Sequence, residues 1–91
     1  MQRVAITPSL LAAVTVDPGE VDAADTLDVD ITVAQSLPEQ FFFVQATEDL
    51  EAGLVIGAAW CATPGTVTFR LANVTATPID PAEQVFNVMA F

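Results

Sequence analysis

The stretch Leu27-Asp28-Val29-Asp30-Ile31-Thr32-Val33-Ala34 decides the fold of this chain, because aliphatic residues alternate in it with polar or small ones. Successive side chains of a β-strand point to opposite faces, so this spacing places four aliphatic side chains on one face. We therefore expect a strand with one face buried in a core and the other in water.

The same alternation occurs at Val67, Phe69 and Leu71, directly after Thr63-Pro64-Gly65. Proline followed by glycine predicts a tight turn, and the strand after it is again expected to be half-buried. Residues 47–52 begin with a threonine and acids that suit a helix start, which predicts about one turn of helix. Residues rich in β-branched and aromatic side chains predict further strands at 3–7, 11–16, 41–46, 54–61 and 85–91.

Short strands separated by turn residues are typical of a β-sandwich. A chain of 91 residues is long enough for one compact domain. We therefore predict an all-β fold, a single-domain antiparallel β-sandwich over residues 1–91, immunoglobulin-like or Greek-key, with six or seven short strands. Residues 41–46, 54–61 and 85–91 are apolar on both faces, so each of these strands is expected to be central or to meet a neighbour on its outer face.

The charge of the chain excludes two classes of ligand. Twelve aspartates and glutamates are opposed by Arg3 and Arg70 alone, which gives a net charge of −10. Binding nucleic acid or an anionic membrane requires clustered basic residues, and two separated arginines do not form a cluster. We expect neither nucleic acid nor a membrane among the partners.

Residues that carry most enzyme chemistry are missing. The chain has no histidine, lysine or tyrosine, so it lacks the usual general bases, Schiff-base amines and imidazole metal ligands. The acidic residues 17–30 do not follow the pattern of a calcium loop, which has a glycine-bearing turn inside the run of ligands and a bidentate acid at its end. The lone Cys61 lies in an apolar run and is expected to be buried and unreactive. We expect no catalytic, cofactor-binding or metal-binding residues, although a hydrolase that uses carboxylates alone remains a distant alternative.

The apolar content points to a protein partner. Of the residues, 53% are hydrophobic and the mean hydropathy is +0.54, which is more apolar side chain than a core of this size can bury. In a strand, Phe41 and Phe43 point away from Phe42, so aromatic side chains fall on both faces. The residues predicted to form an interface are Arg3, Val4, Ile6, Leu10, Leu11, Phe41, Phe43, Phe86 and Phe91.

The hydrophobic pattern of the C-terminal half allows a comparison with known proteins. It runs from Ala52-Gly53-Leu54 through Thr66-Val67-Thr68-Phe69 and Leu71-Ala72-Asn73-Val74-Thr75 to Pro78, Glu83 and the strand at 85–91. This half resembles small virion proteins encoded beside the coat genes of tailed bacteriophages. The N-terminal Val4-Ala5-Ile6, followed by Leu11-Ala12-Ala13-Val14-Thr15, is similar in a looser way. In such phages, proteins of this size serve as head decoration or cement proteins.

The resemblance implies a structural virion protein, not an enzyme, on the outer surface of the phage capsid. It implies the major capsid protein as the partner and a homotrimer as the assembly. The same hydrophobic pattern leaves other functions open. The chain would then be a head-fibre or tail structural subunit, or an immunoglobulin-like adhesion or carbohydrate-binding module.

Overall fold

The computed structural model describes residues 9–91, which form six β-strands. The predicted strand at residues 3–7 lies outside the described residues. No helix occurs in the described part, and so none there is long and apolar enough to cross a membrane. The strands are β1 (Ser9–Val16), β2 (Thr26–Thr32), β3 (Phe42–Ala46), β4 (Leu54–Thr63), β5 (Thr66–Asn73) and β6 (Gln84–Ala90).

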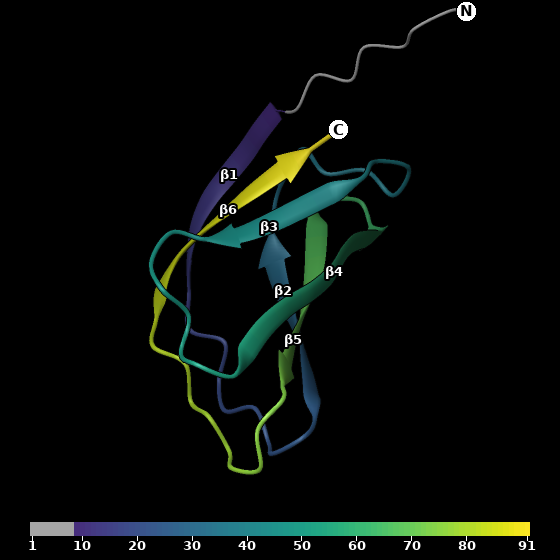
Figure 1. Ribbon diagram of the computed structural model, residues 1–91. Coiled ribbons are helices and arrows are strands. Elements are labelled where there is room, and N and C mark those ends of the chain that lie inside the picture. The colour runs from purple at the N-terminus through teal and green to yellow at the C-terminus, as the bar shows by residue number, and fades with distance from the viewer. Residues whose placement is uncertain (1–8) are drawn as a thin grey trace, which may run out of the picture.

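The strands form two three-stranded antiparallel sheets, β1-β6-β3 and β2-β5-β4, which pack face to face (Figure 1). The prediction of an antiparallel β-sandwich is confirmed. If the strands are lettered A to F in chain order, the sheets read C-F-A and D-E-B. This is the order of immunoglobulin sheets with β1 in the place of the last strand, G.

The core lies between the sheets and is formed by alternate residues of each strand. Phe69 of β5 and Phe86 of β6, the two central strands, are fully buried, and their ring centroids are 5.1 Å apart. Val29 and Ile31, from the stretch that predicts the fold, are buried beside them as expected. Of the strands that are apolar on both faces, β6 is central, whereas β3 and β4 are edge strands.

The turn predicted at Pro64-Gly65 joins β4 and β5, and Thr63 pairs with Thr66 across it. Gly65 has φ of 89°, a left-handed conformation that glycine adopts without strain. With proline before it, this geometry suits a type II turn. The turn lies against the β2–β3 connection, because the Gly65 N–H donates to Oγ of the buried Ser36 at 3.1 Å.

The helical turn predicted at residues 47–52 is wrong. The Thr47 hydroxyl, which was expected to cap a helix, donates instead to the carbonyl of Val85 at 2.7 Å. The Glu48 N–H donates to Oε1 of Gln84 at 2.8 Å. Both groups are therefore used by β6, and a single helical turn is too short to form against such competition.

Candidate interaction surface

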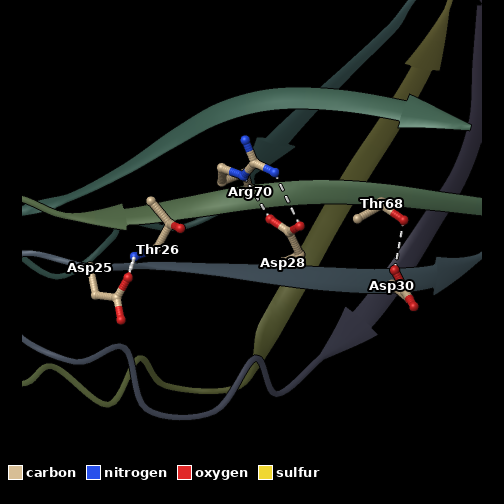
Figure 2. Close-up of polar contacts among 6 residues, drawn as sticks. All are labelled: Asp25, Thr26, Asp28, Asp30, Thr68 and Arg70. Carbon is tan, nitrogen blue, oxygen red and sulfur yellow. Dashed lines mark hydrogen bonds and ion pairs between the residues drawn. The ribbon is translucent and has the colours of Figure 1, made fainter.

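The two outer faces of the sandwich differ in charge. On the β2-β5-β4 sheet, Asp28 and Arg70 lie opposite each other and form a forked ion pair, with distances of 2.7 and 3.2 Å (Figure 2). One step along, the Thr68 hydroxyl donates to Asp30 at 2.6 Å. The hydrogen bond from Arg70 holds the pKa of the Asp28 carboxyl below its ordinary value. This face is a solvated polar surface.

Trp60 belongs to the same polar face. The Arg70 guanidinium lies 5.1 Å from the centroid of the Trp60 ring, in the geometry of a cation–π contact. One arginine therefore links Asp28 of β2 to Trp60 of β4 across the central strand. Because the guanidinium covers the ring, this tryptophan is a poor platform for stacking a sugar.

Within residues 9–91, the outer face of the β1-β6-β3 sheet is uncharged. Strands β1, β3 and β6 contain no Asp, Glu, Lys or Arg. Leu10, Met89 and Phe43 pair directly across the three strands, so they form one row on the outer face. Leu10 and Phe43 are 59% and 55% exposed. The face thus presents adjacent apolar side chains to solvent.

This apolar row continues to the end of the sandwich where the C-terminus lies (Figure 1). The Phe91 N–H donates to the Phe41 carbonyl at 2.9 Å, which extends the ladder between β3 and β6 and pairs these two residues. Phe41 is 76% exposed and Phe91 is 48% exposed. Leu37, in the β2–β3 connection, is exposed at the same end of the sandwich. We call the set Leu10, Leu37, Phe41, Phe43 and Phe91 the aromatic end.

The opposite end is acidic. Because every pair of strands is antiparallel, the β1–β2, β3–β4 and β5–β6 connections all leave the sheets at the end away from the C-terminus (Figure 1). Most of the carboxylates lie in these three connections, which we call the acidic end. They are Asp17, Glu20, Asp22 and Asp25 in the first, Glu48, Asp49 and Glu51 in the second, and Asp80 and Glu83 in the third. The molecule, 48 Å in its longest dimension, is therefore polarised from an aromatic end to an acidic end.

The structure brings together four of the predicted interface residues, Leu10, Phe41, Phe43 and Phe91, all exposed at the aromatic end. Leu11 is half-buried against the core, beside a register shift in β1. Arg3, Val4 and Ile6 lie outside the described residues.

The prediction for Phe86 is wrong: it is 0% exposed and packs on Phe69. It points inward because it pairs with Val14 and Ala46, whose side chains face the core. Leu37 and Met89 also lie on this surface and were not predicted from the sequence. The polar Asn87 between Val88 and Phe86 was the signal for the outer face of β6, since it marks the odd-numbered residues as solvent-facing.

The described residues show no metal site, and their cysteine is buried. No group of three or more His, Cys, Asp or Glu side chains in residues 9–91 could hold a metal ion. Cys61 is buried, as expected, and its thiol donates to the carbonyl of Thr63 at 3.0 Å. Asn73, which begins an Asn-Val-Thr sequence suited to glycosylation, is 2% exposed and has its amide fully hydrogen-bonded. In the folded protein it is closed to modification.

Comparison with known proteins adds no relative: no protein-family model, curated protein or solved structure matches the chain.

Proposed function

We propose that this protein is a structural virion protein, a decoration or cement protein that binds the outer surface of a phage head and stabilises the coat lattice. The major capsid protein is its partner, and the chain works without catalysis. One observation carries the proposal: the exposed apolar residues of the aromatic end gather on an uncharged face, while most carboxylates lie at the opposite end. Such a surface suits contact with protein.

The separation of the aromatic end from the acidic end suggests how the protein would be oriented on a phage head. The aromatic end and the uncharged face would lie on the coat, and the acidic end would point into the medium. A net charge of −10 would repel the packaged genome, so a position outside the shell is favoured over one inside it.

The aromatic side chains supply the binding energy in this proposal. Burying one exposed phenylalanine contributes about 1.5–3 kcal/mol. Phe41 and Phe43 are both more than half exposed, so covering them favours binding by more than one such contribution. A protein that binds the assembled lattice, and not free coat subunits, stabilises the lattice by mass action. Many copies on one shell then act together.

Homotrimer formation is part of the proposal. Its support is the resemblance to decoration proteins, together with exposed apolar residues on the uncharged face that sister copies would cover. The alternative of a head-fibre or tail subunit uses the same surface but a different place on the virion. A carbohydrate-binding module is less favoured, because the described exposed aromatic residues are phenylalanines, which lack a polar group, and Trp60 is covered by Arg70.

The test compares heads of the phage that encodes this chain, with and without the protein, by thermal release of their DNA. We expect heads that lack the protein to release DNA at a lower temperature, and added protein to restore the value. Phe41→Ser should restore it less well, because binding weakens by about tenfold or more. Val74→Ser is the matched control: Val74 is 70% exposed but lies at the acidic end, so this variant should act as the parent. An unchanged release temperature after complete removal of the protein would refute the proposal.

A further inference from the structure

We propose that the free edge of β3 is a second binding site, which takes up an extended segment of another protein as a fourth strand of the β1-β6-β3 sheet. The site lies on the side of the sandwich, between β3 and β4. The inference concerns strand pairing at this edge and stands whatever the aromatic end binds.

The hydrogen-bond pattern identifies the free groups of β3. Residues of an antiparallel pair alternate between those that bond to the partner strand and those that do not. The Phe41 carbonyl accepts from Phe91 and the Thr47 N–H donates to Val85, so the odd-numbered residues of β3 bond to β6. The N–H and C=O groups of Phe42, Val44 and Ala46 therefore point away from β6, along the open edge. These are the groups that an added strand would bond.

The other edge strands carry the features that usually prevent such pairing. Edges are protected by charges, prolines or bulges that disturb the ladder. Strand β2 carries Asp28 and Asp30, β1 has a register shift, and β4 has two. Strand β3 pairs with β6 in regular register and contains no charged residue, proline or glycine. Among the four edge strands of the described part, β3 is the unprotected one.

A groove beside this edge can hold the side chains of an added strand. Strands β3 and β4 belong to different sheets and contact each other, and between them lies a groove of about 290 Å³. Its lining is apolar except for Gln45, and it includes Phe42, Val44, Leu50 and Ile56. Gly57, in the part of β4 between Ile56 and Ala59 where the register shifts, also lines the groove and adds no side chain to it. Apolar side chains at alternate positions of the incoming strand would enter it.

Charge decides between a second copy and a different protein. A symmetric pair of β3 strands centred on Val44 would place Glu39 of one copy opposite Asp49 of the other, at both ends, and would join two molecules of charge −10. Like charges placed opposite each other oppose pairing. The acids after β3, Glu48 and Asp49, instead suit a strand with lysine or arginine at the end that lies beside them. The occupant is therefore an extended segment of another protein, apolar at alternate positions, with basic residues at its start if it runs antiparallel to β3.

The probe is a synthetic peptide of two lysines followed by three Val-Thr repeats, capped at both ends. In the free protein, amide hydrogen exchange should be slow at Phe43 and Gln45 and fast at Phe42 and Ala46, while Val44 is only 4% exposed and is left out of the comparison. With the peptide in excess, exchange at the amides of Phe42 and Ala46 should slow by about tenfold or more. Two further peptides carry N-methyl groups on alternate amides, the first peptide on one set and the second peptide on the other. In the bound strand, one of these sets of amides faces β3 and the other faces solvent. One of these two peptides should bind and the other should not.

Ala46→Pro tests the same edge from the protein side, since it removes an outward N–H and leaves the β6 ladder in place. It should abolish peptide binding, whereas Asn87→Thr, on the outer face of the central strand β6 and away from the groove, should keep it. If the proline variant fails to fold, the N-methylated pair still decides. Equal binding of both N-methylated peptides would overturn the proposal, and so would an unchanged rate of amide exchange in β3 when the parent peptide is added. If amide exchange in β3 slows with protein concentration alone, the proposal is also wrong, and the edge binds a second copy.

Discussion

Replacing Asn73 by aspartate tests the buried polar contacts that hold the acidic end together. Asn73 is 2% exposed, and its Nδ2 donates to the carbonyls of Val21 at 3.1 Å and Thr77 at 2.8 Å. Its Oδ1 accepts from the N–H of Thr75 at 2.9 Å and from the Thr75 hydroxyl at 2.7 Å. Aspartate keeps the shape and the accepting oxygen, but it turns a negatively charged oxygen toward two carbonyl oxygens.

The expected loss is large for a domain of this size. The two hydrogen bonds donated by Nδ2 disappear, and a negative charge is buried without an opposite charge beside it. Together these changes cost about 3–5 kcal/mol of stability. Small domains are stable by about 5–15 kcal/mol in total. With a urea dependence of about 1.5 kcal/mol per molar, the unfolding midpoint of Asn73→Asp should fall by about 2–3 M.

The pH dependence supplies a second sign of the same cause. The new carboxyl is charged at neutral pH and is destabilised by burial, so its pKa in the folded state lies above that in the unfolded state. The penalty is therefore full above the folded pKa and declines as the pH falls toward the unfolded value. The difference in stability between the variant and the parent should narrow between pH 7 and pH 4.

Urea unfolding followed by the fluorescence of Trp60 measures both effects. Asn87→Asp is the control, because Asn87 lies on the outer face of β6, and it should cost less than about 1 kcal/mol. If Asn73→Asp were no more destabilising than Asn87→Asp, or if its penalty grew as the pH fell, the proposed role of Asn73 would be wrong.

Three further predictions concern the core, the polar face and assembly. Phe86→Ala should destabilise the protein by about 3–5 kcal/mol in urea unfolding, because it empties the centre of the core, and a loss below about 1 kcal/mol would contradict that position. In an NMR titration, the pKa of Asp28 should lie below its ordinary value of 3.8, and in Arg70→Gln it should return toward that value. Because the pKa is lower in the folded state, the small stabilisation by this ion pair is present above pH 3.8 and is lost below it. Light scattering should show a homotrimer at high protein concentration, or the three copies should meet on the head, and a monomer in solution with isolated copies on the particle would exclude this assembly.

The sequence predicted the fold well where one face of a strand is polar. At residues 27–34 the aspartates leave one choice of buried face, and Val29 and Ile31 are buried accordingly. In β6, Asn87 is the single polar residue between Val85 and Phe91, so periodicity indicates which face is buried less strongly there than at residues 27–34. Pairing with β1 and β3 makes that choice, and pairing involves residues far apart in the chain.

The candidate surface was predicted in part. Exposed phenylalanines were expected from the run Phe41-Phe42-Phe43, and Phe41 and Phe43 are exposed. Their meeting with Leu10 and Phe91 at one end depends on strand order, which local sequence does not determine. The division into aromatic and acidic ends has the same origin, because antiparallel pairing brings three separate acidic connections together.

Cryo-electron microscopy of heads reconstituted with the protein would show where on the virion it binds and through which face. We expect added density on the outside of the shell, with the outer face of β1-β6-β3 and the aromatic end against the coat and the acidic end in solvent. Density inside the shell or on the tail, or a molecule bound through the Asp28–Arg70 face with Phe41 and Phe43 exposed, would contradict it.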